Sequence, residues 1–250
     1  MGGSMSDWKI DPALEMFDPP ALDRSSMVYW WPRVQGLDGI PMPQTVILEF
    51  GHAKLFKILD GEGLKPDEIE KLVNVCNTIG YPLFLRTDQA SAKWGYGRTC
   101  FVSNHTFLSR NLANLIDSNG CLDLVPEALV IRQYIRPAFR FTAFWGMPIG
   151  SERRYMVKDG KVVRHFPYWP KEAIHNANIK DWEKVLEELN LEGEDEIHLL
   201  TSYAEALGAK LGGYWSVDFM LGKDGKWWFI DMAEGEKSWT PEDMKEDKHG

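Results

Sequence analysis

Apolar residues in the first half of the chain occur either in short continuous runs or at helical spacing. The continuous runs, each bounded by turn-forming residues, predict strands at 45–50, 81–88, 98–104 and 128–135. Between them, apolar residues recur at helical spacing in 66–80 and 105–120, which predicts two helices. Pro66 suits the first turn of the earlier helix and Gly80 ends it. This half therefore predicts a sheet with helices packed against it.

The second half is dominated by antiparallel hairpins. Asp-Gly turns at 159–160 and 224–225 are each flanked by strand-like runs, which is the pattern of a tight turn between paired strands. Segments 171–190 and 194–212 have helical spacing and predict two further helices. Strands mixed with helices, with the hairpins clustered late in the chain, predict an α+β fold class.

The first 36 residues predict an irregular extension and no folded unit of their own. The opening MGGS is typical of an expression tag, and the remainder is rich in proline and turn formers. Only the stretch SSMVYWWPRV, at 25–34, predicts a short strand within this irregular extension.

Composition narrows the classes of function. The chain has 250 residues and a net charge of −9, which argues against a nonspecific nucleic-acid binder, since such binding depends on Lys and Arg. The three cysteines, Cys76, Cys100 and Cys121, form no CxxC pair and predict free thiols in a reducing compartment. No apolar run reaches the roughly 18 residues that span a bilayer. We expect a cytoplasmic protein without a membrane partner.

The last hairpin carries two acids among large apolar residues. If Asp224-Gly225 forms a two-residue turn, Asp218 and Asp231 lie directly opposite each other on one face. Opposed like charges are destabilising unless a cation lies between them, and hard oxygen ligands suit Mg²⁺. Glu234 and Glu236 follow closely and could complete the metal site. The alternative is two acids on a solvated face, and a register shift of one residue would separate them.

The earlier hairpin and the loop before it supply cations. A two-residue turn at Asp159-Gly160 sets Arg154 opposite His165, on a face where Arg154 could bind a phosphate or form a surface Arg–Glu pair. The loop 87–99 contains Ser91 and Lys93 among glycines, a composition that lets backbone N–H groups approach an anion. The loop matches neither phosphate-binding glycine motif, so a plain flexible turn is the alternative.

The order of these segments resembles the ATP-grasp superfamily. The stretches GIPMPQT, RTDQASAK, ERRY, HFPYWP and VDF…DMA…SW follow the pattern of the small stand-alone ATP-grasp domains, over roughly residues 37–239. The resemblance implies two α+β lobes that hold ATP between them. It divides the chain into the extension 1–36, an N-terminal part at 37–127 with the small lobe and the phosphate-binding loop, and a C-terminal lobe at 128–250 with the metal-binding hairpin.

The resemblance also implies residue roles. Arg86 and Lys93, with Ser91 beside them, contact phosphates, and the hinge 133–135 (Gln133, Tyr134 and Ile135) contacts adenine. Arg154 faces the transferred phosphate and is catalytic together with Lys93, and Asp218 and Asp231 bind magnesium. The sequence departs from the family at two points. Arg86 replaces a lysine, and Asp231-Met232-Ala233 replaces Glu-x-Asn, so one metal ligand is missing unless Glu234 or Glu236 substitutes.

Family members use Mg-ATP to phosphorylate a carboxylate, which an amine then attacks, so we expect an ATP-dependent ligase with ATP and Mg²⁺ as cofactors. Its carboxylate and amine are unknown small molecules or peptides, and the short N-terminal part leaves room for a protein partner. An acceptor pocket is expected from aromatic residues that could equally be core residues: Trp30, Trp31, Tyr168, Trp169 and Trp239. Arg136, Arg140 or Arg164 could hold the carboxylate.

Two alternatives remain open. One is an ATP-binding assembly factor that does not ligate, because a eukaryotic family of translation-factor assembly chaperones shares this core and Ala233 cannot bind metal. The other is a nucleotidyltransferase or RNA ligase, which modifies a lysine in K-x-D-G. Lys158-Asp159-Gly160 and Lys223-Asp224-Gly225 lack the spacer residue and are better explained as hairpin turns.

Overall fold

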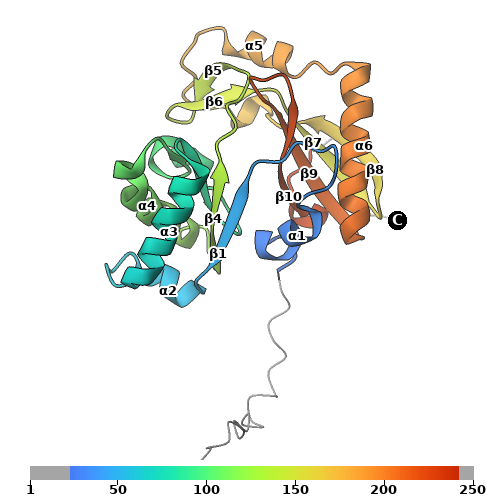
Figure 1. Ribbon diagram of the computed structural model, residues 1–250. Coiled ribbons are helices and arrows are strands. Elements are labelled where there is room, and N and C mark those ends of the chain that lie inside the picture. The colour runs from blue at the N-terminus through green and yellow to red at the C-terminus, as the bar shows by residue number, and fades with distance from the viewer. Residues whose placement is uncertain (1–22, 242–250) are drawn as a thin grey trace, which may run out of the picture.

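Two four-stranded antiparallel sheets form the frame of the protein (Figure 1). The computed structural model describes residues 23–241, so the tag and the chain ends fall outside the described residues. The predicted α+β class is confirmed. Within residues 23–241, none of the helices is long and apolar enough to cross a membrane.

The first sheet has the strand order β1-β4-β2-β3. Its strands are β1 (Thr45–Glu49), β2 (Leu83–Thr87), β3 (Phe101–Val102) and β4 (Ala128–Gln133). Three helices pack with it: α2 (His52–Lys57), α3 (Pro66–Ile79) and α4 (Leu108–Gly120). Buried residues of α3 and α4, among them Leu72 and Leu115, form one core with Leu85 and Ile131 of the sheet. Burial of this apolar face fixes the helices on the sheet.

The second sheet has the order β10-β9-β7-β8. Its strands are β7 (Glu152–Lys158), β8 (Lys161–Pro167), β9 (Tyr214–Leu221) and β10 (Trp227–Glu234). Helices α1 (Met27–Val34) and α6 (Glu194–Leu211) share its core. A separate two-stranded sheet, β5 (Phe139–Ala143) with β6 (Met147–Gly150), packs with α5 (Trp182–Leu189). Short 3-10 turns lie at Lys93–Arg98, His105–Phe107, Lys171–Ala173 and Gly235–Lys237.

The expectation of a strand and an irregular extension at 25–34 is wrong, because this stretch is the helix α1. The Ser26 side chain accepts a hydrogen bond from the Val28 N–H and caps the helix. Met27, Trp30, Trp31 and Val34 are buried at the spacing of one helix face. Trp30 meets Phe229 of β10 edge to face at 5.7 Å between ring centroids. The segment is therefore part of the core of the second sheet.

Two further expectations compare with the structure as follows. Strand β4 pairs with β1 and β2 and so belongs to the first sheet, while the division of the chain into lobes at 127/128 stays a prediction. The helix expected over 171–190 forms only at its end, as α5. The stretch before α5 is held instead by the β5–β6 hairpin, since the Phe144 N–H donates to the His175 carbonyl and the Thr142 N–H to the Asn178 side chain.

Trp30 tests whether α1 belongs to the core. Trp30→Ala removes a fully buried indole and leaves a cavity, so we expect the free energy of unfolding to fall by about 3–5 kcal/mol in chemical denaturation. The matched control is Trp145→Ala, because Trp145 is 80% exposed. Equal stability of the two variants would show that α1 is not an integral part of the second lobe.

Candidate functional site

A row of charged side chains crosses the second sheet. Arg154 of β7 is paired with Asp218 of β9, and Asp218 is paired with Asp231 of β10. Paired residues point to the same face, so the three side chains lie side by side. The two aspartates are opposite each other, as the sequence predicts.

The strand register that places the two aspartates opposite each other has a different origin from the predicted one. The turn is not a two-residue loop, because the Gly222 N–H donates to the Lys226 carbonyl and three residues lie between them. This register alone would misalign the aspartates by one residue. An irregularity in β10 between Phe229 and Asp231 adds one residue and restores the alignment.

The register of the β7–β8 hairpin also differs from the prediction. Its turn pairs Lys158 with Lys161 as expected, but a shift between Met156 and Val157 places Arg154 opposite Phe166 and not His165. His165 instead stacks on Tyr155 and contacts Glu192 at 3.2 Å. His165 therefore takes no part in the row of charges.

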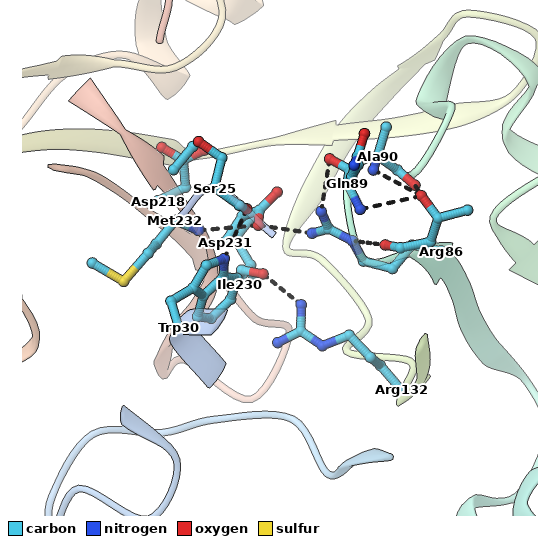
Figure 2. Close-up of polar contacts among 12 residues, drawn as sticks. Ser25, Trp30, Arg86, Gln89, Ala90, Arg132, Asp218, Ile230, Asp231 and Met232 are labelled. Carbon is cyan, nitrogen blue, oxygen red and sulfur yellow. Dashed lines mark hydrogen bonds and ion pairs between the residues drawn. The ribbon is translucent and has the colours of Figure 1, made fainter. Parts of the chain in front are cut away.

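Each aspartate is bound by an arginine. Arg154 donates to both carboxylate oxygens of Asp218, at 2.8 Å from Nε and 2.7 Å from Nη2. Arg86 of β2 reaches across from the first sheet, and its Nη1 lies 2.7 Å from Asp231 Oδ1 (Figure 2). Arg86 is itself held by its donation to the Thr87 carbonyl at 3.0 Å. Two arginines thus neutralise the opposed carboxylates.

The surrounding charges set the protonation of the acids. Burial opposes ionisation of Asp231, but Arg86, Arg132 and Lys93 outweigh it, so the pKa of Asp231 lies below its usual value. Glu152 behaves oppositely. Its burial raises the pKa of the carboxyl above its usual value although Lys93 opposes this, and Asp218 adds to the increase. The Glu152 Oε2 atom is buried without a hydrogen bond in the described structure.

Lys93 lies where the loop from the first lobe meets the second. Its Nζ is 3.8 Å from Glu152 Oε2 and 4.7 Å from the centre of the Tyr168 ring. Burial lowers the pKa of Lys93, but Tyr168, Glu152 and the two aspartates outweigh it and raise the pKa above its usual value. Lys93 is therefore a fixed positive charge at neutral pH.

A cavity between the sheets gathers most of the predicted binding residues. It is lined by Arg86, Ser91, Lys93, Gln133, Tyr134, Ile135 and Asp231. Apolar side chains make up much of the remaining wall: Phe84, Met147, Pro148, Met220 and Ile230. The Tyr134 hydroxyl is 2.8 Å from that of Tyr96, which fixes one side. We call this space the hinge cavity. Its apolar wall and charged end suit a ligand with a flat ring and an anionic tail.

A second cavity adjoins the first. It shares Arg86, Ser91, Lys93, Met147 and Asp231 with the hinge cavity and adds Arg154. Its wall contains five aromatic side chains: Trp94, Phe144, Tyr168, Trp169 and Trp239. We call it the aromatic cavity. The two spaces therefore meet at the cations and at Asp231.

The structure is similar to solved structures of low sequence identity. Cdc123 from Schizosaccharomyces pombe, C-terminally truncated, aligns with a TM-score of 0.54 at 13% identity, over 84% of this chain and 83% of that one. The VanG D-Ala:D-Ser ligase from Enterococcus faecalis aligns with a TM-score of 0.51 at 15% identity, over 87% of this chain and 55% of the ligase. The chain has the ATP-grasp fold.

Identities this low show the fold alone. An ATP complex of D-alanine–D-alanine ligase from Bacillus anthracis aligns at 16% identity with a TM-score of 0.45, over 84% of this chain. The chain spans about half of that ligase, 53% of its length. No family model matches the sequence, and no curated protein matches it.

Within the ATP-grasp fold, the sequence-based prediction missed Arg132. Arg132 of β4 lines the hinge cavity, and its Nη1 donates to the Ile230 carbonyl, which joins the two sheets (Figure 2). Its Nη2 is buried without a partner in the described structure. Burial, together with Arg86 nearby, lowers the pKa of Arg132 to about 9. The sequence feature that could have pointed to Arg132 is its position inside the apolar run LVIRQYI, because a buried charge needs a partner.

Glu234 does not lie with the two aspartates. It is three residues after Asp231 on a strand and so points to the opposite face. There its carboxylate contacts Arg24 and Lys237, at 3.9 and 2.7 Å. Ala233, on the same face as Asp231, has no ligand atom. Within residues 23–241, no three acidic, histidine or cysteine side chains converge as a metal site.

The aromatic residues expected around an acceptor divide into two groups. Trp30 and Trp31 are core residues of the second lobe, whereas Tyr168, Trp169 and Trp239 line the aromatic cavity. The three arginines proposed for a carboxylate, Arg136, Arg140 and Arg164, are not among the residues that line either cavity. Arg140 pairs with Glu188.

The raised pKa of Glu152 predicts a pH-dependent change in stability. The folded protein binds the Glu152 proton more tightly than the unfolded chain, so the ionised carboxylate costs stability above its folded-state pKa. This cost disappears as the pH falls through that value. Glu152→Gln resembles the protonated form, so we expect a higher Tm than the unmodified protein at pH 8 and a smaller difference at pH 5.

The control for this measurement is Glu62→Gln, because Glu62 is exposed. Thermal unfolding of both variants at several pH values checks the sign. A Glu152→Gln Tm below that of the unmodified protein at pH 8 would contradict the stated protonation behaviour.

Proposed function

We propose that the protein binds Mg-ATP between its lobes and transfers the γ-phosphoryl group to a carboxylate, which an amine then attacks. The observation that supports this is a cavity lined by Arg86, Arg132, Lys93, the hinge residues and Asp231, which is paired on the sheet with Asp218. These are the groups that phosphoryl transfer requires, because its barrier is lowered by positioning and by neutralising developing charge. A cytoplasmic location stays part of the proposal.

Residues of the hinge cavity take separate roles in this proposal. Gln133, Tyr134 and Ile135, with the apolar wall, bind the adenine ring. Ser91, Arg86 and Lys93 bind the phosphates at the charged end, and Arg132 carries an unused guanidinium N–H beside them. Arg154 lines the aromatic cavity and faces the transferred phosphoryl group from the acceptor side.

The paired carboxylates of Asp218 and Asp231 fit one magnesium ion. Mg²⁺ is commonly held by one or two carboxylates together with phosphate oxygens. Asp218 and Asp231 supply two adjacent carboxylates, so the missing ligand at Ala233 does not exclude a metal. When bound, the ion neutralises charge on the phosphates as the γ-phosphoryl group departs.

The proposed reaction balances as two displacements. A carboxylate oxygen forms a bond to the γ-phosphorus while the bond to the β–γ bridging oxygen breaks, and ADP leaves with that electron pair. The amine nitrogen then forms a bond to the acyl carbon, phosphate leaves, and the amine proton goes to solvent. Lys93 and Arg154 offset the negative charge that gathers at the transferred group.

ATP binding without ligation is a second candidate. Ala233 favours it, because the residue stands beside Asp231 and offers no oxygen to a second metal ion. ADP release in the presence of carboxylates and amines tests the two candidates. Release that needs both substrates supports the ligase, whereas tight ATP binding with no release under any combination supports the binding module.

The nucleotidyltransferase alternative has less support. Lys158 ends β7 at its hairpin turn and Lys223 lies in the β9–β10 turn, and neither lines the hinge cavity or the aromatic cavity. Intact mass after incubation with ATP tests it directly, because a covalent AMP adduct on lysine would revive the proposal.

Removal of the loop lysine tests the phosphate assignment. Lys93→Ala deletes a charge-assisted contact, so we expect ATP to bind roughly 10–100 times more weakly, as measured by calorimetry. Lys171→Ala is the control, because Lys171 pairs with Glu183 on the surface. Unchanged ATP affinity in Lys93→Ala would contradict the assignment of the loop.

Substitution of the aspartates tests the metal assignment. Asp218→Asn and Asp231→Asn each remove one carboxylate charge, so we expect the gain in ATP affinity on adding Mg²⁺ to disappear in both. The measurement compares ATP binding in Mg²⁺ and in EDTA, with circular dichroism to verify folding. Asp60→Asn, an exposed position, should keep the full Mg²⁺ effect. A Mg²⁺ effect retained in both site variants would place the metal elsewhere.

A further inference from the structure

The aromatic cavity has a wall built from distant parts of the chain. Trp94 comes from the loop of the first lobe, Phe144 from the β5–β6 turn, Trp169 from the segment after β8, and Trp239 from the segment after β10. Trp94 meets Phe144 edge to face at 5.4 Å, and Phe144 meets Trp169 at 5.6 Å. Trp94, Phe144 and Trp169 therefore form one connected aromatic surface, and Trp239 contributes a separate part of the wall.

Part of this aromatic surface is open to solvent. Trp94 is 61% exposed and Trp239 is 46% exposed, while Phe144 and Trp169 are buried. Large apolar groups left in water at the rim of a cavity are typical of a binding surface.

The backbone at the β5–β6 turn is strained. Phe144 has φ +45° and Trp145 has φ +61°, in the left-handed region that is uncommon for residues other than glycine, asparagine, aspartate and histidine. Such strain persists where the surroundings over-determine it, and it gathers at functional sites. Phe144, which lies at this turn, lines the aromatic cavity.

The inner end of the cavity carries three cations, Arg86, Lys93 and Arg154, against one acid, Asp231. The Nζ of Lys93 and the guanidinium carbon of Arg154 each lie 4.7 Å from the centre of the Tyr168 ring. An aromatic wall alone could attract an ammonium group, but here that group would meet two fixed cations. A carboxylate is complementary to this end, and an apolar ring is complementary to the outer wall.

From this arrangement we infer that the cavity takes a carboxylic acid whose carboxyl group is carried next to an aromatic or large apolar group. The carboxylate faces Lys93 and Arg154, and the ring packs against Trp94 and Trp239. This inference rests on the proposed function and names the class of acid that the enzyme activates. Trp94 and Trp239 set the specificity for that acid.

Four probes separate the parts of this inference. N-acetyl-L-phenylalanine carries both groups, N-acetyl-L-phenylalaninamide lacks the carboxylate, N-acetylglycine lacks the ring, and L-phenylalaninamide carries a ring with an amine. Binding is measured by calorimetry and by saturation-transfer NMR, with and without Mg²⁺ and a non-hydrolysable ATP analogue. We expect N-acetyl-L-phenylalanine to bind at least about tenfold more tightly than the other three.

Substitutions in the wall of the aromatic cavity test whether N-acetyl-L-phenylalanine binds there. Trp94→Ala and Trp239→Ala should each weaken N-acetyl-L-phenylalanine about five- to tenfold, as expected for a lost aromatic contact, and leave N-acetylglycine unchanged. Trp145→Ala is the matched control, since Trp145 is an exposed tryptophan that is not among the lining residues. Circular dichroism verifies that each variant is folded.

The inference is overturned if N-acetylglycine or either amide binds as tightly as the acid, or if the control variant weakens binding as much as the other two. Affinity for the ATP analogue is measured in the same samples. Its absence refutes the proposed function, whereas normal ATP affinity without preference for the aromatic acid refutes only the inference about the acid.

Discussion

The opposition of Asp218 and Asp231 is the constraint on which the rest of the site depends. Two carboxylates held at paired strand positions repel each other, and partial burial strengthens the repulsion. The protein offsets it with one arginine for each acid. Because Arg154 comes from the same sheet and Arg86 from the other, this compensation is also a connection between the lobes.

That connection involves the residues that are proposed to bind the ligand. Arg86 reaches from β2 to Asp231, and Arg132 reaches from β4 to the Ile230 carbonyl beside it. Both arginines line the hinge cavity. A structural link is also present away from the cavity, where the buried Asp88 accepts from Ser26 at 2.7 Å and from the Ala128 N–H at 3.0 Å. The lobes are thus tied both through the site and beside it.

Local patterns predicted much of this arrangement, and their failures have physical causes. The opposed aspartates followed from strand periodicity, although the turn was wrong, because an extra residue in β10 cancelled the error. No such cancellation occurs in the β7–β8 hairpin, so the predicted strand partner of Arg154, His165, was wrong and the partner is Phe166.

Glu234 could have been excluded from the metal site on the sequence alone, since it is an odd number of residues from Asp231 on one strand. Helix α1 was missed although its apolar residues are at helical spacing, because Pro32 and the adjacent tryptophans favoured a strand or loop. Trp30 and Trp239 could not be told apart without tertiary structure, since the same residue type serves the core and the cavity wall.

The ion pairs of Arg154 with Asp218 and of Arg86 with Asp231 define which contacts a ligand must replace. Mg²⁺ bound by Asp218 and Asp231 would compete with Arg154 and Arg86 for the same oxygens, and a buried charge left unpaired is costly. A bound polyphosphate would offset that cost, because its oxygens would pair with both arginines while Asp218 and Asp231 held the metal ion. In the proposed function, metal and nucleotide therefore bind favourably together and less favourably apart. This coupling follows from the charges of four side chains and requires no second metal ion, so the alanine at 233 is compatible with Mg-ATP binding even though it removes a ligand that the family pattern supplies.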